Sequence, residues 1–141
     1  MNYKMIVLDL DGTLTNRDKE ITPRTREVLM EAQRQGKIVV LASGRPTQGV
    51  APLARELELE KYGSYILSYN GGMITNCRTG ETVAAALLPP EINRKVVGLA
   101  REQQVNILTY EKDTIITLKK KDPYVELEAR INQMEIKEIS D

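Results

Sequence analysis

Two aspartates, Asp9 and Asp11, stand at the end of an apolar segment near the start of the chain, which reads Met-Ile-Val-Leu-Asp-Leu-Asp-Gly-Thr-Leu. The apolar run is typical of a buried strand, and Gly12-Thr13 ends it in a turn. Alternation along a strand places Asp9 and Asp11 on the same side. Two carboxylates this close repel, so the pair is stable if a cation binds, one takes a proton, or both are solvated. At the carboxyl end of a parallel strand, such a pair indicates a magnesium and phosphate site. The alternative is a solvated turn, because Asp and Gly are common turn residues.

A second motif, Ser43-Gly44-Arg45-Pro46, follows the apolar segment Val39–Ala42. The glycine lets backbone approach an anion, and the proline fits the first turn of a following helix. A serine hydroxyl, free backbone N–H groups and an arginine are donors that suit a phosphate. The alternative is an ordinary loop, with serine as a helix cap and arginine at the surface.

Together with Tyr69-Asn70-Gly71-Gly72, which follows a third apolar segment, these motifs resemble the haloacid dehalogenase superfamily of phosphatases. The closer resemblance is to its Cof-like branch, which carries a type IIB cap. The resemblance implies an α/β fold with a Rossmann-like core. The chain would hold the N-terminal half of that core, with a parallel sheet, and the start of an inserted α+β cap domain.

The resemblance also implies roles for individual residues. Asp9 would be the nucleophile that takes the phosphoryl group, and Asp11 the general acid and base. Mg²⁺ would be the cofactor, with Asp9 and the backbone carbonyl of Asp11 as ligands. The implied phosphate- and substrate-binding residues are Leu10, Gly12, Thr13, Ser43, Gly44, Arg45, Asn70 and Gly71. A carboxylate nucleophile, a metal ion and preorganised donors are what phosphate ester hydrolysis in two steps requires.

Two elements of the family pattern are absent from this sequence. Family members carry, after the cap, a lysine that neutralises the aspartyl phosphate and an acidic Gly-Asp-type loop that completes the metal site. No Gly-Asp pair occurs from Pro89 onward, and the run Lys119–Lys121 follows an expected cap strand and reads as a solvated strand end. We therefore expect the N-terminal portion of an enzyme, weakly active or inactive by itself.

The composition excludes several other functions. The 20 basic and 20 acidic residues balance, so no overall field gathers nucleic acid or an acidic membrane surface. No apolar stretch reaches membrane-spanning length, and no secretion signal precedes the first strand. The single cysteine, Cys77, forms no internal disulfide, and the absence of histidine removes an activating base for it. These features predict a cytoplasmic globular protein.

The pattern of apolar residues predicts two parts, a core over residues 1–82 and a partial cap over residues 83–141. In the core we expect strands at Tyr3–Leu10, Ile38–Ala42 and Tyr65–Ser68, with helices from Thr22-Pro23 to Gly36 and at Thr47–Leu59. A hairpin of Met73–Thr75 and Thr82–Leu87 follows. The cap should contain helices Glu91–Gln104 and Pro123–Ile131 and strands Val105–Tyr110, Thr114–Leu118 and Ile136–Ile139.

The sequence thus predicts a magnesium-dependent phosphatase that hydrolyses a small phosphorylated metabolite, of sugar phosphate type, through an aspartyl-phosphate intermediate. Phosphomannomutase-like phosphoryl transfer is an alternative, because that enzyme shares the Asp-x-Asp-Gly-Thr start and a similar cap. The other alternative is a non-catalytic fragment that binds a partner, or that binds only metal and phosphate.

Because the related fold flanks strand one with a later strand that this sequence lacks, we also expect self-association through an open sheet edge.

Overall fold

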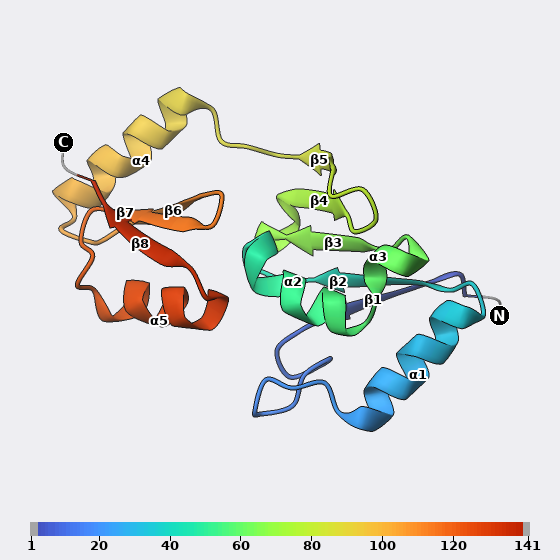
Figure 1. The fold of residues 1–141 in the computed structure, drawn as a ribbon. Helices are drawn as coiled ribbons and strands as arrows, with labels where there is room; N and C mark the ends of the chain where they lie inside the picture. The colour runs from blue at the N-terminus through green and yellow to red at the C-terminus, as the bar shows by residue number, and fades with distance from the viewer. Residues whose placement is uncertain (1–2, 140–141) are drawn as a thin grey trace. The chain divides into compact units, whose positions relative to one another are not determined.

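The computed structural model describes residues 3–139. They form two compact units, the first ending at Ala86 and the second beginning at Leu87. The first unit is an α/β layer structure, and the second is a smaller α+β structure (Figure 1).

The first unit is built on a five-stranded sheet with the order β1-β2-β3-β4-β5. Its strands are β1 (Met5–Asp9), β2 (Ile38–Ala42), β3 (Tyr65–Ser68), β4 (Met73–Asn76) and β5 (Thr82–Ala85). The first three strands run parallel, and the β4–β5 hairpin continues the sheet in antiparallel fashion. β1 pairs with β2 over its whole length, with Asp9 opposite Ala42.

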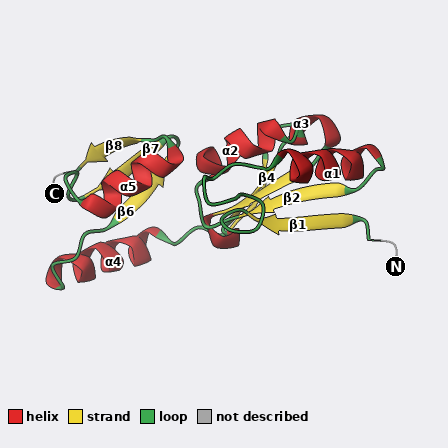
Figure 2. Ribbon diagram, turned by 90° about the horizontal axis from the view of Figure 1, so that it is seen from below, coloured by secondary structure: helices red, strands yellow, loops and turns green. Residues whose placement is uncertain are grey.

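Three helices, α1 (Pro23–Arg34), α2 (Thr47–Glu56) and α3 (Leu59–Tyr62), cover one face of this sheet (Figure 2). The hydroxyl of Thr22 caps α1 by accepting a hydrogen bond from the backbone of Thr25 at 3.2 Å. The left-handed Gly36, with a φ of +79°, follows the helix end. Apolar side chains between the helices and the sheet form the core: Leu10, Leu14, Ile21, Leu29, Val39, Leu41, Val50, Ala54, Leu57, Leu59 and Ile66.

β1 lies at the edge of the sheet and is covered on one face only. Its residues alternate in burial, and Leu8 packs against the core. Met5 and Val7 remain 48% and 55% exposed. Within the described residues, the strand that carries Asp9 therefore has one strand partner and one apolar face open to solvent.

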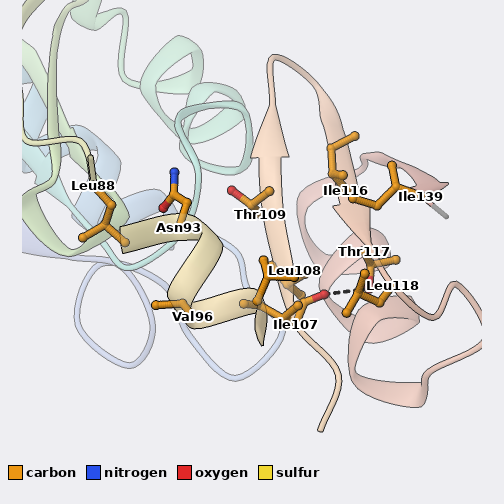
Figure 3. Close-up of a pocket in the computed structure, with 11 residues that line it drawn as sticks. Leu88, Asn93, Val96, Ile107, Leu108, Thr109, Ile116, Thr117, Leu118 and Ile139 are labelled. Carbon is orange, nitrogen blue, oxygen red and sulfur yellow. Dashed lines mark hydrogen bonds between the residues drawn. The ribbon is translucent and has the colours of Figure 1, made fainter. Parts of the chain in front are cut away.

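The second unit is a three-stranded sheet, β6 (Leu108–Glu111), β7 (Thr114–Thr117) and β8 (Glu135–Glu138), in the order β6-β7-β8. Helix α5 (Pro123–Asn132) connects β7 to the parallel strand β8 and packs on the sheet through Val125 and Ala129. Helix α4 (Pro90–Glu102) precedes β6. An apolar pocket lies in this unit, lined by aliphatic side chains from α4 and the sheet region (Figure 3).

Most of the expected elements are present, and several differ in extent, β6 among them, which begins at Leu108 and not at Val105. β1 is shorter than Tyr3–Leu10 because β2 offers it partners only from Met5 to Asp9. The helix expected at Thr47–Leu59 divides into α2 and α3 because Glu58 adopts a left-handed conformation, with a φ of +51°. β5 belongs to the first unit, so the expected boundary at 82/83 lies at 86/87, since β5 is hydrogen-bonded to β4.

Within residues 3–139, the structure contains no helix long and apolar enough to cross a membrane.

The open edge of β1 leads to a prediction about self-association. An exposed, apolar strand edge is a template for pairing with another chain. We expect the sedimentation coefficient of the chain to rise with concentration, and a Val7→Lys substitution to reduce the rise. Val28→Lys, the same change at an exposed position of α1, serves as the control. A monomer at all concentrations, with strongly protected amides at Ile6–Leu8, would contradict the prediction.

Candidate active site

Three loops meet at the carboxyl ends of β1, β2 and β3, which is where open parallel sheets bind ligands. Asp9 ends β1 and Asp11 lies in the first loop, the second loop carries the Ser43–Pro46 motif, and the third carries Tyr69–Gly72. The sequence motifs that are far apart along the chain are thus brought to one edge of the sheet.

The first loop is a tight turn built around the backbone carbonyl of Leu10. This oxygen accepts hydrogen bonds from the backbone of Thr15 at 2.9 Å and from the Thr15 hydroxyl at 3.0 Å. Leu10 and Leu14 are buried in the core, which fixes the turn, while Asp9 and Asp11 on either side of Leu10 are exposed. The pairing of β1 with β2 ends at Asp9. The position of Asp11 is therefore set by the turn, whereas the sequence predicted that strand alternation would set it.

Gly12 sits at the sharpest point of this turn, with a φ of +81°. A Cβ atom at this position would meet nothing within 4 Å. Glycine is therefore required by the backbone conformation and not by lack of space. Thr13 closes the turn by donating its backbone N–H to the Leu10 carbonyl at 3.3 Å.

The second and third loops are joined by backbone hydrogen bonds. Asn70 donates to the Ser43 carbonyl at 3.1 Å, and Tyr69 donates to the Arg45 carbonyl at 3.0 Å. Tyr69, Asn70 and Gly71 all have positive φ values, which folds the third loop back onto the second. A Cβ at Gly44 would lie 3.0 Å from the side-chain oxygen of Asn70, so this glycine permits the close contact.

Ser43 and the start of α2 provide hydrogen-bond donors at the same edge. The Ser43 hydroxyl accepts a hydrogen bond from the backbone of Arg45 at 3.2 Å, which leaves its own proton to donate elsewhere. Pro46 precedes α2 and gives the helix no side-chain cap. Donors at the end of a helix that has no cap suit an anion.

Arg45 binds Asp11, a contact that the sequence did not predict. Its guanidinium donates from Nη2 to Oδ1 of Asp11 at 2.6 Å and from Nε to Oδ2 at 3.2 Å. The Arg45 side chain is only 14% exposed, so this fork is well defined. In this arrangement Arg45, which the sequence assigned to phosphate binding, holds the carboxylate of Asp11.

Lys19 adds a second cation to Asp11, with its Nζ 2.9 Å from the same Oδ1. Burial alone would raise the pKa of the Asp11 carboxyl. The hydrogen bonds and charges of Arg45 and Lys19 outweigh it, so the pKa is lowered. Lys19 was not among the predicted site residues, although the polar segment that follows the aspartates in the sequence places a basic side chain near them.

The metal-ligating groups fit only part of a magnesium site. Among residues 3–139 there is no group of three or more His, Cys, Asp or Glu side chains arranged to hold a metal ion. The Asp11 carboxylate is held by two cations, which leaves the Asp9 carboxylate and the Asp11 backbone carbonyl as donors. Mg²⁺ takes six oxygen ligands, so water or other groups would have to supply the rest.

Comparisons with known proteins show which family the chain resembles. Residues 6–141 match the family model described as haloacid dehalogenase-like hydrolase. A Streptococcus pyogenes protein, named as a candidate phosphatase, is 34% identical over 83% of this chain and 44% of its own length. The 5-amino-6-(5-phospho-D-ribitylamino)uracil phosphatase YwtE of Bacillus subtilis is 28% identical over 81% of this chain and 38% of its own length.

A solved structure gives the same result for the fold. The crystal structure of a haloacid dehalogenase-like hydrolase from Bacteroides thetaiotaomicron superposes with a TM-score of 0.91. It is 50% identical in sequence, over 99% of this chain and 53% of that one. The chain thus spans about half the length of the relatives that it matches.

The turn at Gly12 gives a prediction about stability. Gly12→Ala should lower the free energy of unfolding by about 1 kcal/mol, because an L-residue other than Asn or Asp is strained at positive φ. Gly12→Asn should cost less, since asparagine tolerates this region best. Urea unfolding of the two variants measures the difference. A larger loss for Gly12→Asn than for Gly12→Ala would mean that the side chain's bulk, and not the backbone conformation, requires glycine.

Proposed function

The chain belongs to the haloacid dehalogenase-like hydrolase family, and we propose that it carries the phosphoryl-accepting part of a phosphatase for small phosphorylated metabolites. The observation that carries the proposal is the meeting of Asp9, Asp11 and the Ser43 loop at one edge of the sheet. Asp9 is exposed and ends β1 opposite Ala42, the residue that precedes the Ser43 loop.

In the proposed reaction, Asp9 attacks phosphorus and the bond to the leaving oxygen breaks, which gives an aspartyl phosphate and an alcohol. Asp11 supplies a proton to the leaving oxygen. In the second step Asp11 takes a proton from water as the water attacks phosphorus, which releases phosphate and restores Asp9. Ser43 and the neighbouring amides would stabilise the charge on the equatorial oxygens.

The contacts of Asp11 favour one of these two roles. With Arg45 and Lys19 bound, the Asp11 carboxyl is held in its ionised form, which is the form that accepts a proton from water. Donating a proton in the first step requires the combined hold of the two cations to weaken. An incoming phosphoryl group, itself an anion, is suited to draw away Lys19, the more exposed of the two.

The proposed cofactor is Mg²⁺, held by the Asp9 carboxylate and the Asp11 backbone carbonyl. When bound, the ion would offset negative charge between Asp9 and the phosphoryl group. The described residues supply only part of a metal-ligand set. This also favours a second hypothesis, in which this chain alone binds metal and phosphate without turnover.

We propose a sugar phosphate or a sugar-alcohol phosphate as the substrate class. The support is the name of the Bacillus subtilis relative YwtE, a phosphatase for a compound that carries a phosphorylated ribityl chain. Incubation with a hexose 1-phosphate separates this proposal from mutase chemistry, because a phosphatase yields free phosphate and a mutase yields hexose 6-phosphate.

The nucleophile is tested by Asp9→Asn in a polypeptide that joins this chain to the part of the Bacteroides thetaiotaomicron hydrolase that it does not cover. Phosphate release should fall by several orders of magnitude, beyond the roughly hundredfold to ten-thousandfold of a general acid–base effect. Asp113→Asn, the same change in the exposed β6–β7 turn, is the control and should leave release unchanged. Near-normal release by Asp9→Asn would refute the assignment.

The incomplete ligand set predicts weak Mg²⁺ binding by this chain. Asp9 and the Asp11 carbonyl supply two of six oxygen positions, so calorimetry should show no tight, stoichiometric site. What binding there is should decrease further in Asp9→Asn. Tight binding at one ion per chain would show that the described side chains include metal ligands not identified above.

A further inference from the structure

The loop between β1 and α1 ends in an ordered turn, residues 16–20, here named the flap turn. The side-chain oxygen of Asn16 accepts hydrogen bonds from the backbone of Asp18 at 2.9 Å and of Glu20 at 3.0 Å. The backbone of Asn16 donates to the Glu20 carbonyl at 2.9 Å. Lys19 has a positive φ of 65°, an uncommon conformation for a lysine, and donates its backbone N–H to the Asn16 carbonyl at 3.1 Å. In this turn the side chain of Lys19 reaches the Asp11 carboxylate.

Two cations share the Asp11 carboxylate. Arg45 already satisfies both carboxylate oxygens with its fork, and Lys19 adds its ammonium to the oxygen that Arg45 Nη2 also binds. Each carboxylate oxygen therefore keeps a partner when Lys19 leaves, so Lys19 is available to bind a further anion.

Stability does not account for the position of Lys19. Its side chain is 59% exposed, and an ion pair so open to solvent contributes little to folding. The contact nevertheless comes with a backbone conformation that lysine rarely adopts. The hydrogen bonds of Asn16 within the flap turn hold Lys19 in this conformation.

Lys19 also lies on the wall of a surface pocket that begins at the aspartate. The pocket is lined by Asp11, Gly12, Thr15, Asn16, Arg17 and Lys19. An anion that enters there meets the Lys19 ammonium and the Gly12 turn. Lys19 is more exposed than Arg45, and its ammonium sits on a flexible four-carbon stem, so it can change partner without movement of the backbone.

We propose, on the basis of the phosphatase function proposed above, that Lys19 is a phosphate-binding residue whose ammonium passes from Asp11 to an oxygen of the substrate's phosphoryl group. Arg45 keeps its fork on Asp11 while Lys19 moves. The flap turn, which lies between β1 and α1, thus supplies a cation to the phosphate site. No covalent bond changes in this step.

Titration of inorganic phosphate into the ¹⁵N-labelled chain, followed by NMR, tests the proposal without requiring turnover. Phosphate should shift the amides of Gly12, Thr13, Ser43 and Gly44, whereas sodium chloride at equal ionic strength should not. Lys19→Gln should raise the dissociation constant for phosphate about tenfold, because one charge-assisted hydrogen bond is lost. Lys19→Arg, which keeps the charge, should bind within about threefold of the wild type.

The matched control is Lys4→Gln, which removes the same charge at the opposite end of β1. If Lys19→Gln and Lys4→Gln bind phosphate equally well, the role of Lys19 is wrong while the phosphate site stands. If phosphate does not shift the four amides in the wild-type chain, the proposed function fails and the Lys19 proposal fails with it. The dispersion of the amide spectrum shows directly whether each variant is folded.

Discussion

The parallel register of β1 on β2 is the constraint on which the site depends. Because Asp9 pairs opposite Ala42, the loop that follows Asp9 and the loop that follows Ala42 leave the sheet at the same level. Only then can Arg45 reach Asp11 across 34 positions of sequence. A shift of one residue would turn the side chains of β1 to the opposite face and move Leu8 away from the core, so burial of that face fixes the register.

The ion pairs at Asp11 differ in what they can contribute. The Arg45 fork is bidentate and its guanidinium side chain is only 14% exposed, although Asp11 is 42% exposed; a bidentate pair holds a defined orientation. The Lys19 contact is exposed, and surface pairs of this kind are worth about 0–1 kcal/mol. Arg45 is therefore suited to orient Asp11, and Lys19 is suited to exchange partners. This division follows from burial alone, before any substrate is considered.

The sequence predicted the parts of the structure that depend on local pattern. The bounds of β2 and β3 match the apolar segments, because these strands are covered by helices and read as continuous apolar runs. The start of α1 matches because a threonine cap and a proline mark it. The break at Glu58 was not predictable, since it rests on a left-handed residue that carries no turn signal. The pairing of Arg45 with Asp11 was missed for a different reason. Arginine was assigned to the phosphate of a substrate, whereas in the structure its guanidinium binds the carboxylate of Asp11.

The location of the site on β1 links catalysis to the completeness of the sheet. In the described residues β1 has one strand partner and an uncovered apolar face, so it is the least supported of the three parallel strands. Backbone groups on such a strand open more readily than those of β2, which is paired on both sides and buried. Phosphoryl transfer depends on donors and nucleophile held in fixed positions, and small displacements are costly. Any element that pairs with the free edge of β1 would therefore steady Asp9 and Asp11 directly, even if it contributed no side chain to the site.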